Sequence, residues 1–252
     1  MMDTQMLITM VIMVVLFEGF LLFLYVKYKQ GKIDRNPFLT IIIKEWKIIY
    51  YAIFHWRKHN RSSPFSLHEK SMYFWLFLAL LHEQIIEMFV FHIYFKKEEP
   101  SIAYIMSGLH IYSIIYIIGD YNWVRNTPVL VKDNKVVMKI GARRELMFHI
   151  EDIERIQATS IQYKQSGEMI HEQNVFHVTA FPRVLTRIFG ISDELKYEII
   201  FKSPIASTGY FGMKKKVSKA LIYIHQSDNL VEYFQDNKIN VEKGLKETVM
   251  VN

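Results

Sequence analysis

The sequence predicts a helical membrane bundle of about three spans plus an interfacial amphipathic helix, followed by a β-rich domain with a C-terminal helix. Two observations lead to this fold class. Long apolar runs dominate between residue 6 and about residue 123, although the mean hydropathy of the whole chain is only +0.08. From about residue 125 the chain is polar, with short β-branched runs. We therefore expect a transmembrane domain over residues 1–124, a β domain over residues 125–237 and a flexible tail over residues 238–252.

Composition narrows the classes of function. The chain has no cysteine, which excludes disulfides, thiolate metal sites and thiol nucleophiles. A net charge of +6 is also typical of nucleic-acid binding, but in a membrane protein basic residues mark the cytoplasmic side or contact anionic lipid. The expected partners are the lipid bilayer and either anionic headgroups or a cytoplasmic protein, and nucleic acid is not expected.

The first apolar run, residues 6–26, is about 20 residues long and can cross a hydrocarbon layer of roughly 30 Å. A signal peptide would need a basic start, a shorter apolar run and a small-residue cleavage site. Residues 1–5 contain no lysine or arginine, and the segment around Tyr25 is not such a site. We expect a retained membrane-spanning helix.

Two later runs, residues 72–95 and 102–118, are also long and apolar enough to span a membrane. A short charged segment that ends at Pro100 joins them. The two runs should therefore form an antiparallel hairpin.

Residues 38–58 have an amphipathic pattern. On a helix with about 100° per residue, a polar, partly basic stripe faces away from a wide apolar side, on which Glu45 is the one exception. The stripe consists of Thr40, Lys44, Lys47, Tyr51, His55 and Lys58. Such a helix suits the plane of the membrane interface, and a fourth span is the alternative.

Basic residues flank this amphipathic segment on both sides. They are Lys27, Lys29, Lys32, Arg35, Arg57, Lys58, Arg61 and Lys70. By the positive-inside rule both flanks lie in the cytoplasm if the segment does not cross, and the N-terminus is then outside. If the segment crosses, the N-terminus is inside. In both cases we expect a multi-pass protein of the cell (plasma) membrane with a cytoplasmic C-terminal domain.

Ionisable side chains lie near the middle of each expected span. They are Glu18, His82, Glu83, Glu87 and His110. A charged group at the bilayer centre costs several kcal/mol, so such groups usually face one another inside the bundle. Glu83 and Glu87 are four apart on one helix face, and Tyr104, Ser107 and His110 follow one another at three-residue steps. We expect these polar sides to converge.

Even if these residues converge, three roles remain open for them. They could form hydrogen bonds that hold the helices together, handle protons or cations, or bind a metal ion or haem. The metal signal is weak. His82 and Glu83 begin like the zinc motif H-E-x-x-H, but Ile86 stands where the second histidine is needed. His92 lies roughly on the opposite helix side from Glu83, and a haem would need His82 with His110. No cofactor is expected, and a metal ion or haem in the bundle is the alternative.

After Pro128 the pattern changes from helical to strand-like. Residues 129–131 and 136–140 flank Asp133 and Asn134, which favour a hairpin turn. Further strands are expected over residues 145–150, 160–164, 175–180, 197–201 and 220–225. A helix over residues 228–235, with Ser227 as its N-cap, should close a small antiparallel barrel or paired-sheet domain.

The run VLVKDNKVVMKIGARRELMFHIEDIERIQ, and later FGMKKKV and ALIYIH, resemble the bacterial pleckstrin-homology-like domains that are attached to membrane helices. The shared pattern is a strand, a turn, a strand that ends at Gly141, a further strand and an Ile-x-x-Ile connection. The resemblance covers residues 129–235. It implies a seven-stranded sandwich capped by a helix, a fold that binds lipid or protein and seldom catalyses reactions, although fold alone does not set function.

Two segments of the β half are candidate surfaces for lipid or partner binding. The expected loop over residues 203–219 carries Tyr210, Phe211, Lys214, Lys215 and Lys216, and each lysine contributes about 1 kcal/mol near an anionic surface. An ordinary solvated loop is the alternative. Residues 181–191 are apolar with Arg183 and Arg187 four apart, which fits a short helix that caps the sheet or a partner-docking element.

The leading functional hypothesis is a non-enzymatic, membrane-anchored scaffold or sensor whose cytoplasmic domain binds a protein partner or the lipid surface. The alternative is an intramembrane metal- or proton-dependent enzyme or transporter that uses the Glu and His residues of the spans.

Overall fold

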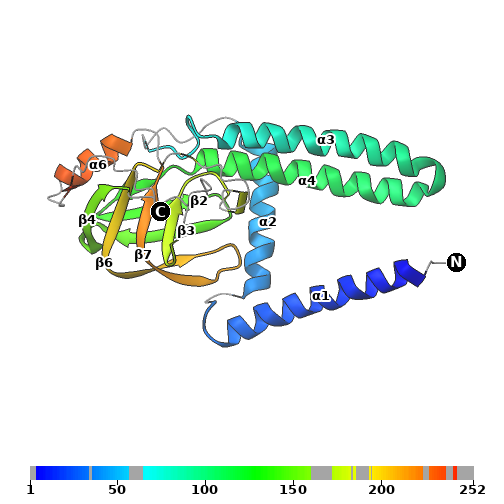
Figure 1. Cartoon of the computed structure of the whole chain (residues 1–252), viewed down its shortest axis with the longest axis horizontal. Coiled ribbons are helices and arrows are strands. Elements are labelled where there is room, and N and C mark those ends of the chain that lie inside the picture. The colour runs from blue at the N-terminus through cyan, green and yellow to red at the C-terminus, as the bar shows by residue number, and fades with distance from the viewer. Residues whose placement is uncertain are drawn as a thin grey trace, which may run out of the picture.

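The computed structural model describes residues 4–33, 36–56, 65–159, 172–182, 184–185, 193, 195–223, 227–236 and 241–242. Four long helices precede a curled sheet, and a further helix packs against that sheet (Figure 1). The helices are α1 (Thr4–Lys29), α2 (Pro37–Phe54), α3 (Tyr73–Glu98), α4 (Pro100–Asn126) and α6 (Ser227–Asp236).

Helices α1, α3 and α4 extend from the sheet in the same general direction, and α2 runs across them close to the sheet (Figure 1). The predicted antiparallel hairpin is confirmed, because α3 ends at Glu98 and α4 begins at Pro100 and packs along α3. Proline suits the first turn of a helix, where its missing N–H would have no partner. The N-terminal end of α1 and the α3–α4 turn lie on the side away from the sheet.

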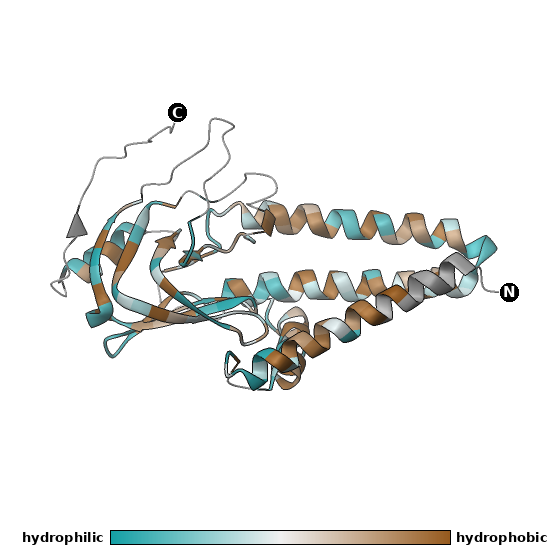
Figure 2. Cartoon of the chain, turned by 60° about the horizontal axis from the view of Figure 1, so that its bottom comes forward, coloured by the Kyte–Doolittle hydropathy of each residue, from teal (hydrophilic) through white to brown (hydrophobic). Residues whose placement is uncertain are grey.

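Among the described residues, α3 and α4 are long and apolar enough to cross a membrane, with 26 and 27 residues. At about 1.5 Å per residue, each exceeds the roughly 30 Å of a hydrocarbon layer. Figure 2 shows apolar residues recurring along α3 and α4. The third expected span corresponds to α1, which has 26 residues and stays a prediction.

Helix α2 is amphipathic in the way that its sequence predicts. On its polar side, Tyr51 stacks on Trp123 of α4 with 5.3 Å between ring centroids, and the neighbouring Ile48 is buried. The opposite side exposes large apolar side chains, which include Ile42, Trp46 and Ile53. The side chain of Asn36 starts the helix by accepting hydrogen bonds from the backbone N–H groups of Phe38 and Leu39.

Helix α4 crosses α2 at Gly119. A Cβ atom on this residue would lie 2.3 Å from the backbone oxygen of Ile48 and 2.7 Å from its side-chain Cγ2. The backbone of Ile48 cannot give way unless the two helices separate, so the crossing requires glycine.

Replacing Gly119 with alanine is expected to push α2 away from α4 and to lower the melting temperature of the detergent-solubilised protein by several degrees. Gly108→Ala is the matched control on the same helix, because nothing lies within 4 Å of its Cβ position. Alanine is the better helix former by about 1 kcal/mol, so this control should leave the melting temperature unchanged or raise it. If Gly119→Ala melts like the wild type, the two helices do not touch at this point.

The described residues of the β domain form a curled mixed sheet of eight strands. Strands β1, β2, β3, β6, β4 and β8 follow one another across it, and β7 pairs with β5 and β6. The 12-residue β6 joins the two parts of the sheet, because its first half pairs with β4 and its end pairs with β3. The strands are β1 (Leu130–Lys132), β2 (Lys135–Ile140), β3 (Arg144–His149), β4 (Ile153–Ala158), β5 (Val175–Val178), β6 (Tyr197–Thr208), β7 (Lys214–Ile222) and β8 (Val241–Glu242).

The hairpin turn between β1 and β2 is confirmed. Asp133 and Asn134 have positive φ angles of 50° and 62°, which a tight two-residue turn requires. The sheet is mixed rather than wholly antiparallel, because β5 runs parallel to β7 and β8 runs parallel to β4. The strand expected over residues 160–164 lies outside the described residues.

The expected loop over residues 203–219 is wrong. Strand β6 continues to Thr208 and β7 begins at Lys214, so the turn between them is residues 209–213. The two strands pair across this stretch, with Ile205 opposite Val217. The polar residues of the segment belong to two strands joined by backbone hydrogen bonds. Pairing with the neighbouring strand makes each an extended strand, although its local composition does not indicate one.

The ends of the helices and the sheet share one hydrophobic core. Helix α6 contributes one side to it, with Leu230, Val231 and Phe234 buried. Buried side chains from the start of α3, the segment before it and the end of α4 join the same cluster. They are Phe65, Leu67, Tyr73 and Val124. The α3–α4 hairpin is therefore packed directly against the β domain.

Candidate functional site

Two ionisable side chains, Glu87 of α3 and His110 of α4, face each other within the α3–α4 hairpin. Oε2 of Glu87 lies 3.5 Å from Nε2 of the buried His110, and Gln84 Nε2 donates a 3.1 Å hydrogen bond to the same oxygen. Nδ1 of His110 lies 2.8 Å from the carbonyl oxygen of Met106, so it carries a hydrogen. A favourable contact at Nε2 then needs a proton on that nitrogen or on the carboxyl group. The predicted convergence is observed for Glu87 and His110.

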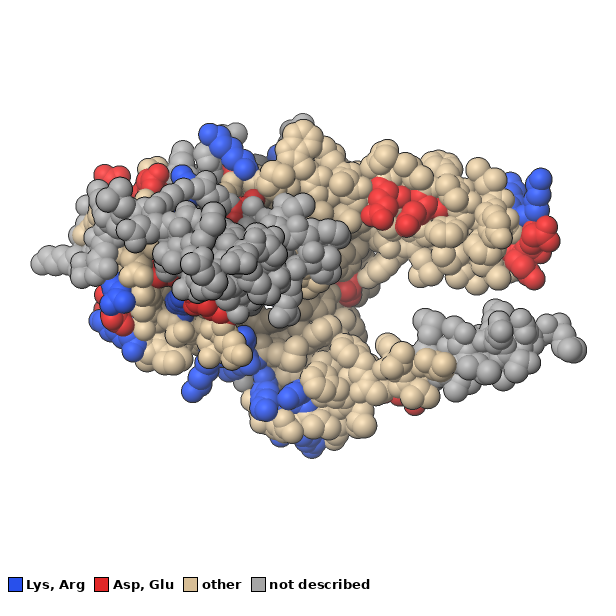
Figure 3. Space-filling model, viewed as in Figure 1, with Lys and Arg blue, Asp and Glu red and all other residues tan. Residues whose placement is uncertain are grey.

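The other ionisable residues expected in this cluster lie apart from it. Glu18 on α1 and His82 and Glu83 on α3 are exposed, and Figure 3 shows acidic side chains on the outer surface of α3. Ser107 pairs with His92 instead, with 2.9 Å between Oγ and Nδ1. Within the described residues, no group of three His, Asp or Glu side chains comes together in a way that could hold a metal ion.

The turn between β6 and β7, residues 209–213, is fastened to the helices. The backbone N–H of Lys214 donates a 3.1 Å hydrogen bond to the carbonyl oxygen of Lys32, just after α1. Phe211 packs edge to face against Phe20 of α1, with 5.3 Å between ring centroids. Phe211, a predicted lipid or partner contact, therefore contacts a helix of its own chain.

Glu45, the exception on the apolar side of α2, connects three elements. Tyr112 of α4 donates a 2.5 Å hydrogen bond to its Oε2, and Tyr210 of the β6–β7 turn donates a 2.6 Å bond to its Oε1. Burial raises the pKa of Tyr210 and the bond to Glu45 raises it further, so Tyr210 stays a donor. Next to Glu45, the ammonium group of Lys44 donates to the backbone oxygens of Gly209 and Tyr210.

A pocket of about 570 Å³ opens between α2, the β2–β3 hairpin and the β6–β7 turn. Its charged lining is mostly basic, with five cationic side chains and one carboxylate. They are Lys44, Lys47, Lys139, Arg144, Lys214 and Glu145. Lys139 Nζ lies 3.5 Å from Glu145 Oε2, so the carboxylate already has a cationic partner. Leu39, Ile43 and Trp123 form an apolar part of the wall.

The basic lining changes the protonation of Lys44. Its pKa is lowered from 10.5 to about 8, first by burial and then by repulsion from Lys139, while Glu145 opposes the shift. The folded protein therefore loses this proton at lower pH than the unfolded chain does. Consequently, Lys44 makes the folded state more stable as pH rises from about 8 to 10.5.

Lys44 is expected to titrate with a midpoint near pH 8 in the intact protein. Isotopic methylation of the lysines, with Lys44→Arg to identify the signal, gives this midpoint by NMR. Lys139→Gln should raise the midpoint because it removes a repulsive charge, and Glu145→Gln should lower it. A midpoint near 10.5 would mean that the amine is solvated and that the lining charges do not act on it.

The predicted binding residues lie in different surroundings. Lys214 lines the pocket, whereas Lys215 and Lys216 are exposed on β7 outside its lining. Arg183 and Arg187 lie outside the described residues.

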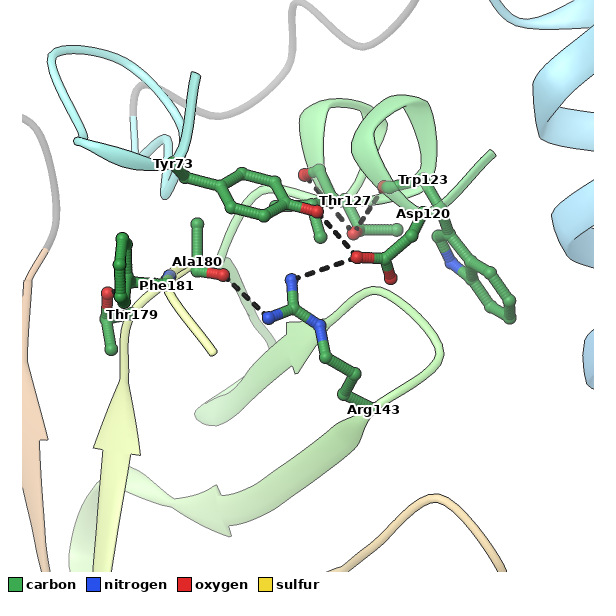
Figure 4. Close-up of polar contacts among 9 residues, drawn as sticks. Tyr73, Asp120, Trp123, Thr127, Arg143, Thr179, Ala180 and Phe181 are labelled. Carbon is green, nitrogen blue, oxygen red and sulfur yellow. Dashed lines mark hydrogen bonds and ion pairs between the residues drawn. The ribbon is translucent and has the colours of Figure 1, made fainter. Parts of the chain in front are cut away.

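A largely buried ion pair joins α4 to the turn between β2 and β3 (Figure 4). Arg143 Nη2 lies 3.3 Å from Oδ2 of Asp120, and Tyr73 at the start of α3 donates a 2.5 Å hydrogen bond to the same oxygen. Arg143 also donates a 2.7 Å bond to the carbonyl oxygen of Ala180. Burial alone would lower the pKa of Arg143, but the Asp120 carboxylate raises it above its ordinary value. Only 21% of Arg143 and 14% of Asp120 are exposed, so removing either partner leaves a poorly solvated charge.

A second carboxylate, Asp193, holds the N-terminal end of α3. It accepts hydrogen bonds from Ser71 Oγ and the backbone N–H of Met72, both 2.9 Å long. Thr179 Oγ1 also donates to it, at 2.5 Å. A negative charge at a helix N-terminus is favourable, so Asp193 ties α3 to the segment after β5.

Sequence reasoning missed Lys139 and Arg144 in the pocket and the Asp120–Arg143 pair. One signal for the pair was present: Asp120 is a carboxylate two residues after the end of the apolar run of residues 102–118. The pocket residues gave no such signal, because Lys139 and Arg144 read as ordinary polar positions of a hairpin.

Comparison with known proteins does not assign this chain to a family. No protein-family model matches the sequence, and neither a curated protein nor a solved structure matches it. The basic pocket and the contacts around it are the geometry from which a function can be proposed.

Proposed function

We propose that this chain is a multi-pass protein of the cell (plasma) membrane whose cytoplasmic β domain binds the anionic lipid surface as a non-enzymatic scaffold or sensor. The observation that carries the proposal is the location of the basic pocket. It opens between the sheet and α2, a helix whose other side exposes large apolar residues. The resemblance of residues 129–235 to pleckstrin-homology-like domains agrees with a binding role.

Two features support three spans with α2 in the membrane interface. Helices α1, α3 and α4 extend from the sheet in one general direction and are 26, 26 and 27 residues long. Helix α2 runs across them, with Ile42, Trp46 and Ile53 exposed on the side opposite its contacts with α4. A helix with one apolar and one basic side is most stable lying in the interface plane, so we assign α2 to headgroup depth.

The charge distribution favours a cytoplasmic β domain. Lys27, Lys29 and Lys32 lie at the sheet end of α1 and directly after it. At the far end of the hairpin, the described residues carry Lys96 and Lys97 as their basic side chains. By the positive-inside rule, the side with more lysine and arginine faces the cytoplasm.

The cysteine-free sequence allows the topology to be tested by single cysteine substitutions. With a membrane-impermeant maleimide on intact cells, Lys97→Cys is expected to be labelled. Lys32→Cys and Lys70→Cys, on either side of α2, should be labelled only after the membrane is opened. Labelling of Lys32→Cys and Lys70→Cys from opposite sides would show instead that α2 crosses the membrane.

Lipid binding is tested with the full chain in nanodiscs of phosphatidylcholine alone or mixed with phosphatidylglycerol. We expect the anionic lipid to raise the melting temperature and to slow hydrogen exchange in residues 209–213, because it binds the folded arrangement. The effect should shrink between about 0.1 M and about 1 M salt, where the Debye length falls from about 10 Å to about 3 Å. Identical behaviour in both lipid mixtures would reject lipid binding and leave a cytoplasmic protein as the partner to seek.

A further inference from the structure

We infer that the basic pocket binds the headgroup of one anionic phospholipid, with the phosphate among the lysine and arginine side chains and the glycerol end beside α2. This inference rests on the proposed function, because it requires α2 to lie at headgroup depth. It goes further by assigning one lipid to one pocket, where the proposed function needs only an attractive surface.

The charge of the pocket selects an anion. Of its six charged side chains five are basic, and the one carboxylate, Glu145, lies 3.5 Å from Lys139. The five cations share a partly enclosed space, where like charges repel more strongly than in open water. Burial first, and then repulsion from Lys139, lower the pKa of Lys44. A phosphate group relieves this repulsion, and Arg144 offers a planar group suited to two hydrogen bonds to its oxygens.

The shape of the pocket favours a lipid over a free phosphate ion. Its volume of about 570 Å³ lies in the range of pockets for small organic ligands. Leu39 and Ile43 line it on the α2 side and remain 55% and 45% exposed. A free phosphate ion has no apolar surface to bury. In a phospholipid, the glycerol and the first acyl carbons bury apolar surface against such a wall.

The pocket also lies where a lipid can reach it. Ile43 borders both the pocket and the exposed apolar side of α2, which we assign to the membrane interface. Figure 3 shows lysine and arginine side chains gathered near the corner between α1 and α2 and on the neighbouring part of the sheet. A headgroup in the outer part of the leaflet therefore meets basic side chains on both sides of the opening.

The test is native mass spectrometry of the full-length protein released from nanodiscs that contain phosphatidylglycerol. The pocket variant is Lys47→Gln with Lys214→Gln. The matched control is Lys215→Gln with Lys216→Gln, which removes the same charge from the strand that carries Lys214 but outside the pocket lining. We expect the wild type and the control to retain one lipid per chain, and the pocket variant to retain it about tenfold less.

Three other outcomes overturn the inference in different ways. Equal loss in both variants rejects the pocket but keeps general surface binding, and so keeps the proposed function. A wild type with neither retained lipid nor stabilisation by phosphatidylglycerol rejects both. Inorganic phosphate and glycerol 3-phosphate carry the same phosphate chemistry, so each is added to the wild type in neutral detergent. Stabilisation by either as strong as that by phosphatidylglycerol would assign the pocket to a soluble anion.

Folding of the variants is checked in nanodiscs of phosphatidylcholine alone, where the pocket variant should melt like the wild type. If the double variant is unstable there, Lys47→Gln alone serves as the test, with lipid retention expected to fall several-fold. Unchanged retention in a folded Lys47→Gln variant would contradict the inference.

Discussion

The contact between α2 and α4 at Gly119 determines where the basic surface lies. Because glycine lets the backbone of Ile48 approach α4 directly, α2 can run across the helical hairpin rather than along it. The stacked rings of Tyr51 and Trp123 extend the contact on the same side of α2. With that side fixed, the lysines of α2 face the sheet and its large apolar residues face away. A bulkier residue at the crossing would move one whole wall of the pocket.

Packing the helices against one another and against the sheet requires partners for the charges that they bring, because an unpaired buried charge costs several kcal/mol. Glu45 accepts hydrogen bonds from two tyrosines, and Asp120 is paired with Arg143. In the pocket, cations outnumber carboxylates in the lining. An excess of positive charge in one place lowers the stability of the folded chain unless an anion binds there. Such local violations are typical of binding sites.

The sequence was most informative where structure depends on local properties. Length and hydropathy identified the α3–α4 hairpin, and helical periodicity identified both sides of α2. Long-range pairing was not accessible: the parallel β5–β7 pair joins residues as far apart in sequence as Val175 and Lys219. The β6–β7 pair is local, but the polar composition of the ends of its two strands favoured a loop. The predicted convergence failed for Glu83 because positions four apart on a helix differ by about 40°, enough to turn Glu87 toward His110 and leave Glu83 outside. Among the pocket residues, the sequence singled out only the α2 lysines and Lys214. The others could not be identified, because the pocket forms only when α2 and α4 cross at Gly119.

A ligand in the pocket would contact segments that are far apart in the chain, namely α2, the β2–β3 hairpin and the β6–β7 turn. These segments are otherwise joined by specific polar contacts, such as those from Lys44 and Tyr210. We call the arrangement in which the β domain packs on α2 the docked state. A ligand that binds only the docked state stabilises it, and the free energy gained grows with the logarithm of the ligand concentration once that exceeds the dissociation constant. The anionic lipid content of the leaflet would therefore set how firmly the β domain is held on α2. Through this linkage the proposed scaffold or sensor can respond to membrane composition, because the quantity that lipid changes is the free energy of docking.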